Sequence, residues 1–279
     1  MAASDSWRHP RSALRQRVLT AIVLIAGMLV ALFAMPATAG ALALALVMLG
    51  GAWEWAGFFG AHPRSPERIA YAAGMALLMA VFWALTEVDQ TLYRAVLWGA
   101  ALWWLIALGW LFRFPTRIPA PVGILCGILV LVPAWLALAR LLFEPRGDHW
   151  LLFVFVLVWA ADIGAYFVGR AIGRVRLAPR VSPNKTWEGV LGGLAAASLA
   201  AVFGARWLDQ PLAGFFALCV AAALASIVGD LTVSMFKRHA GLKDSSDLLP
   251  GHGGILDRID SMMAAAPLFV LGLRWIGAP

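Results

Sequence analysis

The sequence predicts an all-α, polytopic integral membrane protein with about nine transmembrane helices and a cytoplasmic N-terminus. Of its 279 residues, 62% are hydrophobic and only 13% are charged, whereas apolar residues make up about half of a soluble domain. The mean hydropathy is +0.82. Fourteen Trp and fifteen Phe against three Tyr fit a lipid-facing surface with interfacial belts. This composition excludes a disordered chain, a secreted free domain and a disulfide scaffold.

Nine apolar runs with few or no charges are long enough to cross the hydrocarbon core as helices. We expect these spans at 18–35, 38–59, 69–86, 94–112, 122–143, 151–169, 188–208, 212–236 and 262–278. The first run follows basic residues and precedes Ala37-Thr38-Ala39, as a signal peptide would. Its apolar stretch of 18 residues is longer than a normal signal-peptide core. We therefore expect an uncleaved anchor.

The basic residues predict the orientation of these spans. The net charge is +7, and a cytoplasmic N-terminus places 17 of the 22 basic residues on the cytoplasmic side. This asymmetry is what the positive-inside rule describes. The positive charge therefore orients the helices, and we expect no nucleic-acid partner. Cys126 and Cys219 lie in different apolar runs, where we expect small buried side chains without a metal or redox role.

The chain divides by composition into two regions. Residues 1–155 are ordinary spanning material that we expect to form a lipid-facing scaffold, and residues 156–279 hold the polar residues of a catalytic region at the cytoplasmic face. One acid of the first region, Glu54, lies in Trp53-Glu54-Trp55 near the cytoplasmic end of its span. An acid near a helix centre costs about 2.5–3.5 kcal/mol on insertion scales. Near the end it can reach headgroups or an Arg, so a structural role is slightly favoured over a functional one.

A polar face is predicted at the end of the eighth span. If that span continues as helix to Arg238, then Asp230, Ser234, Lys237 and Arg238 share one face, with offsets of 4, 7 and 8 residues. A carboxylate, a hydroxyl and two cations would then line one wall of a pocket. The alternative is an Asp–Arg pair that caps a helix near the interface.

The segment after this face favours a phosphate site. Pro250-Gly251-His252-Gly253-Gly254 cannot form regular helix, and a Gly-rich turn before a helix exposes N–H groups that bind phosphate. Asp257 and Asp260 follow, one turn apart, where the helix dipole alone would favour acids. Placing three acidic and four basic side chains at the edge of a bilayer costs free energy unless they pair with each other or bind a ligand. The carboxylate oxygens of these acids are too few to surround a metal ion completely. Such a set suits Mg²⁺, which can complete its coordination with substrate phosphates.

Two earlier segments carry polar residues on the same side. Asp162 and Tyr166 lie one turn apart on the sixth span, and a basic loop leads to Ser182-Pro183-Asn184-Lys185-Thr186-Trp187. Ser182-Pro183 reads as a helix start, so one interpretation is a capped re-entry into the membrane. The other is that Ser182, Lys185 and Thr186 bind nucleotide or lipid phosphate. The segment is not a P-loop, since Gly-x-x-x-x-Gly-Lys-Ser/Thr does not occur.

The run from Ser234 to Asp260 resembles the signature of phosphatidate cytidylyltransferases (CDP-diacylglycerol synthases): Ser-x-x-Lys-Arg-x4-Lys-Asp, then Pro-Gly-His-Gly-Gly, then Asp-Arg-x-Asp. Asp162-x-Gly-Ala-Tyr166 and Ser182-Pro-x-Lys185-Thr186-Trp-Glu-Gly are similar to upstream blocks of that family, with Asn184 where Lys is frequent. The resemblance implies Mg²⁺-dependent formation of CDP-diacylglycerol and pyrophosphate from CTP and phosphatidic acid in the bilayer, at the cytoplasmic face of a bacterial-type inner membrane. It also implies that Asp230 and Asp257 hold the metal, beside a second cation such as K⁺.

We assign roles from the positions and charges of these residues together with the resemblance, which itself covers only the metal pair. The expected metal ligands are Asp230, Asp257, Asp260 and Asp162. The expected catalytic residues are Lys237, Arg238, Lys243, Asp244, His252 and Arg258. The expected substrate-binding residues are Ser182, Lys185, Thr186, Ser234, Gly253 and Gly254. The Ala/Gly-rich helix surfaces leave room for a homodimer.

Two alternatives stay open at this point. The chain could be a CTP transferase that acts on another lipid phosphate, such as a polyprenyl phosphate. It could instead be a secondary transporter whose intramembrane acids bind ions. Against the transporter, the polar residues gather on one side of the membrane and no paired repeat is visible.

Overall fold

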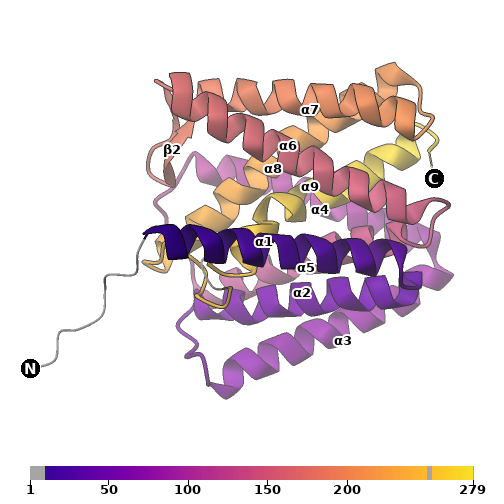
Figure 1. Ribbon diagram of the computed structural model, residues 1–279. Helices are drawn as coiled ribbons and strands as arrows, with labels where there is room; N and C mark the ends of the chain where they lie inside the picture. Colours follow the sequence, from indigo (N-terminus) through magenta and orange to yellow (C-terminus); the bar gives the residue numbers. More distant parts are fainter. Residues whose placement is uncertain (1–9, 250–252, 279) are drawn as a thin grey trace, which may run out of the picture.

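A computed structural model describes residues 10–249 and 253–278 as a helical bundle with one short β-hairpin (Figure 1). The elements of this part of the chain are α1 (Pro10–Phe33), α2 (Ala37–Gly57), α3 (Pro66–Val88), α4 (Gln90–Leu111), α5 (Ala120–Leu141), α6 (Gly147–Ile172), β1 (Arg176–Ala178), β2 (Ser182–Thr186), α7 (Trp187–Trp207), α8 (Leu212–His239) and α9 (Leu256–Trp275). Each helix matches one predicted span, so the all-α membrane class is confirmed.

Seven of the described helices, α2 to α8, are long and apolar enough to cross a membrane. In α1 the apolar part is Leu19–Phe33, and α9 begins with charged residues. That α1 and α9 also cross the membrane, which would make nine spans, therefore stays a prediction. α9 lies inside the bundle, packed mainly against α8, α5 and α4.

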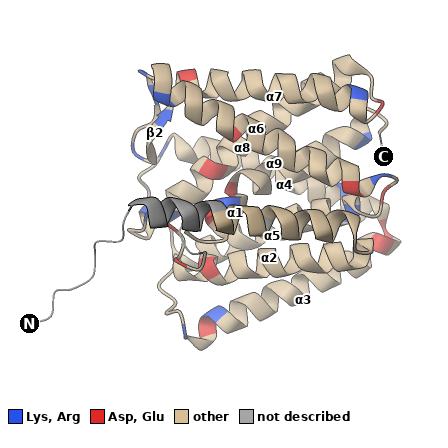
Figure 2. Cartoon of the chain, in the orientation of Figure 1, with Lys and Arg blue, Asp and Glu red and all other residues tan. Residues whose placement is uncertain are grey.

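The connections lie at the two ends of the bundle. We call the end that carries the β-hairpin the hairpin end; the connections 58–65, 112–119, 173–186 and 240–255 lie there. Figure 2 shows the Lys, Arg, Asp and Glu residues mainly near the two ends, with a long uncharged middle. The polar residues singled out in the sequence follow or precede the connections at the hairpin end.

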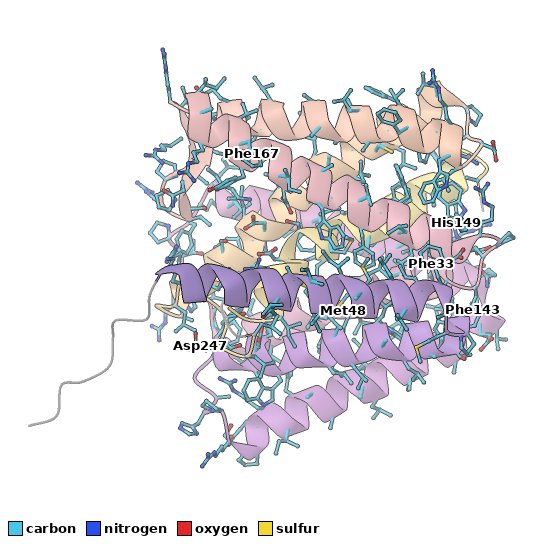
Figure 3. The ribbon with its side chains drawn as sticks, in the orientation of Figure 1. Phe33, Met48, Phe143, His149, Phe167 and Asp247 are labelled. Atoms are coloured by element: carbon cyan, nitrogen blue, oxygen red, sulfur yellow. The ribbon has the colours of Figure 1, made fainter. Side chains whose placement is uncertain are left out.

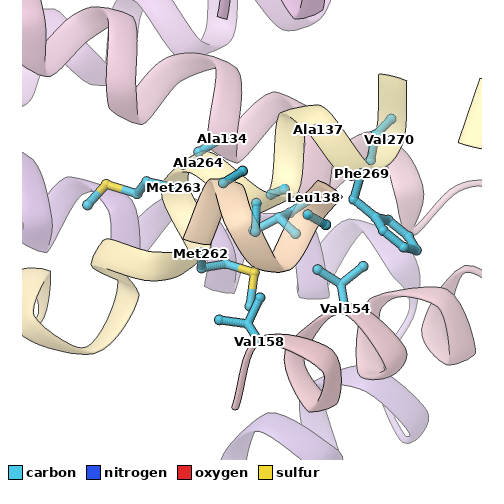
Figure 4. Close-up of a cluster of buried hydrophobic side chains, with 14 of the residues drawn as sticks. Ala134, Ala137, Leu138, Val154, Val158, Met262, Met263, Ala264, Phe269 and Val270 are labelled. Atoms are coloured by element: carbon cyan, nitrogen blue, oxygen red, sulfur yellow. The ribbon is translucent and has the colours of Figure 1, made fainter. Parts of the chain in front are cut away.

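The middle of the bundle is held by apolar packing between α5, α6 and α9. Figure 4 shows Leu138 of α5, Val154 and Val158 of α6, and Met262 and Phe269 of α9 in one cluster, all nearly inaccessible to solvent. At the far end, Phe33 of α1 meets the ring of His149 of α6 edge-on, with centroids 5.7 Å apart (Figure 3). This contact helps to hold α1 against the rest of the bundle.

The β-hairpin corrects one prediction. Ser182 and Pro183 do not start a helix; they belong to β2, which pairs antiparallel with β1. The helix begins five residues later, at Trp187, because Thr186 is its N-cap and accepts a hydrogen bond from the Gly189 N–H at 3.1 Å. The hairpin is fixed on α8 by Arg238, whose Nε donates to the Val181 carbonyl at 3.2 Å.

Glycines let α6 and α7 approach closely, as small residues do in membrane helix pairs. A Cβ at Gly164 would lie 2.6 Å from the Gly192 carbonyl oxygen and 2.7 Å from the Ala196 Cβ. We expect Gly164→Val to lower the free energy of unfolding by about 1–3 kcal/mol through overpacking. Thermal unfolding in detergent measures this loss. Gly74→Val is the matched control, because a Cβ at Gly74 meets nothing within 4 Å; an equal loss in both variants would contradict the close-packing argument.

Candidate active site

An ion pair joins the hairpin to the core of the predicted site. Lys185, near the end of β2, donates to Asp230 of α8, 45 residues along the chain. Ser234 lies one turn further along α8 and donates to the other oxygen of Asp230 at 3.2 Å. The helix runs to His239, as the offset argument required. Asp230 is thus held between a strand residue and a residue of its own helix.

Two further carboxylates surround this ammonium. Burial alone would lower the pKa of Lys185, but the charge of Asp230, its hydrogen bond, and the charges of Asp162 and Asp260 together raise that pKa above its ordinary value. Asp162 comes from α6 and Asp260 from α9. We call Lys185, Asp162, Asp230 and Asp260 the Lys185 cluster. Because the pKa is raised, Lys185 stays a cation throughout the neutral pH range.

A glycine allows α8 and α9 to bring this cluster together. A Cβ at Gly229 would lie 2.5 Å from the Asp260 carbonyl oxygen and 3.0 Å from the Ala264 Cβ. Ser261, next to Asp260, reaches the Asp162 carboxylate with its hydroxyl at 3.4 Å. Three helices and one strand therefore contribute to a single charged site.

A second, more deeply buried pair lies beside this cluster. Lys237 Nζ donates to Asp257 Oδ1 at 2.6 Å, and the two side chains are only 10% and 7% exposed. Asp257 Oδ2 accepts from the Ser245 N–H and the Gly254 N–H, each at 2.9 Å, and from the Ser245 hydroxyl at 3.0 Å. Asp257 therefore ties α8 to the connection between α8 and α9.

Glu54 corrects another expectation from the sequence. Its side chain is fully buried and faces the α8–α9 connection instead of headgroups. Its carboxylate accepts hydrogen bonds from Ser245, Ser246, Ile255 and Leu256. The expected Arg exists: Arg68 interacts electrostatically with Glu54. Ser245 and Ser246 were not among the predicted site residues. The only signal for them in the sequence is the presence of two adjacent hydroxyls before a Gly-rich turn.

The other predicted residues have varied surroundings. Arg238 donates to main-chain carbonyls of Val181 and Leu242. Thr186 is buried and caps α7, whereas Ser182 lines a cavity. Lys243, Asp244 and Arg258 are exposed, as are Arg238 and Asp162.

The glycines before α9 shape the turn that Asp257 binds in this structure. Gly253 has φ of +75° and pairs with Leu249, and the Gly254 N–H is bound by Asp257. Their predicted contact with substrate stays a prediction. His252 lies outside the described residues, with Pro250 and Gly251.

Two cavities adjoin the Lys185 cluster. The first, of about 600 Å³, lies between α6, α7, the hairpin and α8. We call it the polar cavity because five charged side chains line it beside apolar residues: Asp162, Arg170, Arg176, Lys185 and Asp230. The second, of about 540 Å³, lies between α1, α2, α6 and the start of α9. Its lining is largely apolar, with Ile25, Met28, Val47 and Phe155, and it includes Arg258 and Asp260. Asp162 lines both cavities, so the cluster lies where a polar and an apolar space meet.

Comparison with known proteins identifies the family. The model of the Cytidylyltransferase family matches residues 15–276, nearly the whole chain. The chain belongs to the cytidylyltransferase family. This cytidylyltransferase is 44% identical over 276 residues to the phosphatidate cytidylyltransferase of Pseudomonas aeruginosa, which covers 95% of the chain and 100% of the relative. It is 42% identical over 282 residues to the phosphatidate cytidylyltransferase of Haemophilus influenzae, which covers 92% of the chain and 97% of the relative.

The acids of the Lys185 cluster in this cytidylyltransferase fit a Mg²⁺ ion that is shared with substrate phosphates. Among residues 10–249 and 253–278, no three His, Cys, Asp or Glu side chains are grouped closely enough to hold a metal ion by themselves. The Lys185 cluster instead offers a few hard carboxylate oxygens beside an open polar cavity. Such a set suits Mg²⁺ that completes its coordination with substrate phosphates and water.

Asp257 differs from the acids of the cluster. Four protein hydrogen bonds already reach its two oxygens. The metal role predicted for Asp257, like those predicted for Asp162, Asp230 and Asp260, stays a prediction.

Proposed function

We infer that this chain is a phosphatidate cytidylyltransferase, which transfers CMP from CTP to phosphatidic acid and gives CDP-diacylglycerol and pyrophosphate. Relatives with that name cover nearly its full length. The observation that carries the inference is the meeting of the polar and apolar cavities at Asp162, beside the Lys185 cluster. A reaction between a water-soluble polyanion and a lipid phosphate requires two such spaces that share one site.

The linings of the two cavities support an assignment of the substrates. Arg170, Arg176 and Lys185 in the polar cavity suit the triphosphate of CTP, because Lys and Arg bind phosphate oxygens. The second cavity suits acyl chains along Ile25, Met28 and Phe155. Arg258 lies at the same cavity and suits the phosphate of phosphatidic acid. The two phosphates would then meet at the Lys185 cluster.

The chemistry needs alignment and charge neutralisation more than a base. A bond forms between an oxygen of the lipid phosphate and the α-phosphorus of CTP, and the bond from that phosphorus to the oxygen bridging to the β-phosphate breaks. Pyrophosphate leaves with the electron pair. The attacking oxygen is already anionic near neutral pH, so Lys185 and the nearby Arg residues serve by holding two polyanions together. Mg²⁺, held by Asp230 and its neighbouring acids, would neutralise further charge on the phosphates.

Charge supports a cytoplasmic site in a bacterial inner membrane. The connection with the hairpin carries Arg174, Arg176, Arg180 and Lys185, and other connections at this end add further Arg residues. The far end has fewer basic residues, and positive charge marks cytoplasmic connections. We therefore place the hairpin end in the cytoplasm. The predicted K⁺ and the predicted homodimer stay predictions.

The test uses the purified, full-length protein with Mg²⁺, labelled CTP and a panel of lipid phosphates in mixed micelles. We expect pyrophosphate release and a labelled CDP-lipid with phosphatidic acid. Release only with another lipid phosphate, such as a polyprenyl phosphate, would reassign the substrate. Lack of release with every lipid would contradict the inference and favour the transporter.

Removal of divalent cations is expected to stop this reaction. The carboxylates of the cluster repel phosphate groups unless a metal ion lies between them, so excess EDTA should abolish CDP-lipid formation and added Mg²⁺ should restore it. Initial rates over a Mg²⁺ titration measure the effect, with added K⁺ as a separate variable. Full activity in EDTA would contradict the proposed metal.

A further inference from the structure

We propose that Glu54 is a positioning residue for the transfer reaction, acting from α2 on the segment that carries Asp257. The proposal rests on the proposed function above. Glu54 lies 191 residues before Ser245, in the region that the sequence assigned to the scaffold. All four of its hydrogen-bond donors nevertheless belong to the α8–α9 connection and the first residue of α9.

The carboxylate supplies the cap that α9 does not have in its own sequence. Oε1 accepts from the Ile255 N–H at 2.9 Å, and Oε2 accepts from the Leu256 N–H at 2.8 Å. The first N–H groups of a helix have no partner within the helix, and a negative charge there is favourable. Ile255, the residue before α9, has an apolar side chain that cannot cap it. Glu54 therefore fixes where α9 starts.

Two hydroxyls connect the same carboxylate to the connection itself. Ser246 Oγ donates to Glu54 Oε1 at 2.5 Å, and Ser245 Oγ lies 2.8 Å from Glu54 Oε2. The Ser245 hydroxyl is also 3.0 Å from Asp257 Oδ2. One hydroxyl proton is thus placed between two carboxylates. Any shift of Ser245 changes the hydrogen bonds of Asp257, whose other oxygen binds Lys237.

The packing around Glu54 allows little movement. A Cβ at Gly254 would lie 2.6 Å from Glu54 Oε2, so only glycine lets the chain pass over this carboxylate. A Cβ at Gly51 would lie 3.1 Å from the Leu256 side chain, which keeps α2 close to α9. Arg68 faces Glu54 as a compensating charge, and its guanidinium lies 4.3 Å from the centre of the Trp53 ring. The buried charge is therefore held in one geometry.

The decisive variant is Glu54→Gln. An amide keeps the size but puts an NH₂ group opposite donors that need an acceptor, so Ser245 and the start of α9 should shift. We expect kcat with phosphatidic acid and CTP to fall about 10–100-fold, as for other residues that orient catalytic groups. The KM for CTP should change little, because Glu54 does not line the polar cavity. Amide hydrogen exchange at Ser245, Ile255 and Leu256 should become faster.

Glu144→Gln is the matched control, because it makes the same change at the opposite end of α9. Glu144 pairs with Arg274, with the atoms 3.5 Å apart. We expect its kcat to stay within about twofold of the wild type. An equal loss of kcat in the two variants would mean that Glu54 only stabilises α9 in general, and it would overturn the proposal. Unchanged kcat and exchange in Glu54→Gln would overturn it as well.

Ser246→Ala tests the same idea if Glu54→Gln does not insert into the membrane. It removes one donor and keeps the charge, so kcat should fall and exchange at Ile255 should rise, both less than in Glu54→Gln. Unchanged values would overturn the proposal. The wild type is measured in the same assay; if it forms no CDP-lipid, the proposed function fails, whereas a normal wild type with a normal variant contradicts only the role of Glu54.

Discussion

Replacing Asp230 by Asn is expected to lower CDP-lipid formation by about 10³-fold or more, while the protein still inserts. The substitution keeps the shape but removes the charge that pairs with Lys185 and that accepts the Ser234 hydroxyl. Lys185 then keeps only the more distant charges of Asp162 and Asp260. A metal ion shared with phosphate would also lose an anionic ligand. Both effects weaken the alignment of two polyanions, which is the main task of this site.

The measurement is the initial rate of CDP-lipid formation per folded protein, with thermal unfolding in detergent as the check on integrity. Asp209→Asn is the matched control, because Asp209 lies at the far end in an exposed pair with Arg146, 3.1 Å apart. Surface pairs contribute little, so this variant should behave as the wild type. Near-normal turnover in Asp230→Asn would remove the Lys185 cluster from the reaction.

The helices of this protein could be predicted closely from the sequence because span length and hydropathy are local properties. The predicted span 212–236 matches α8, and the offsets along it placed Asp230 and Ser234 one turn apart correctly. The start of α9 was predicted six residues late, at 262 instead of Leu256. Hydropathy leaves out Asp257 and Asp260, whereas the structure buries both carboxylates and pairs Asp257 with Lys237 of α8.

The site could be predicted only in part, because spacing does not indicate long-range partners. Arg238 follows Lys237 on the same predicted face, but it donates to the hairpin carbonyl of Val181 while Lys237 pairs with Asp257. Lys185 reaches Asp230 over 45 residues, and Glu54 reaches Ser245 over 191. The hairpin was missed for a similar reason: Ser-Pro fits a helix start locally, and strand pairing with β1 overrides that preference.

The buried pair of Lys237 and Asp257 gives a prediction that separates stability from chemistry. Lys237→Met leaves the Asp257 carboxylate inside the bundle without its cation, with side chains that are only 10% and 7% exposed in the pair. Removing one partner of such a pair typically costs about 3–5 kcal/mol, so the single variant should be both unstable and inactive. The double variant Lys237→Met/Asp257→Asn removes both charges. It should regain most of the stability, because a neutral pair of similar size has no unpaired charge to bury.

The activity of the double variant then decides what the pair does. If Asp257 holds the metal, as the family resemblance implies, and Lys237 binds phosphate, as we predict, the stable double variant should remain about 10²-fold or more below the wild type. The pair Glu144 and Arg274 at the other end of α9 is the control, being 3.5 Å apart and about one-third exposed. Its single and double variants should change stability and activity little. An active double variant would make the Lys237–Asp257 pair a device for folding only and assign the phosphate chemistry to the Lys185 cluster alone.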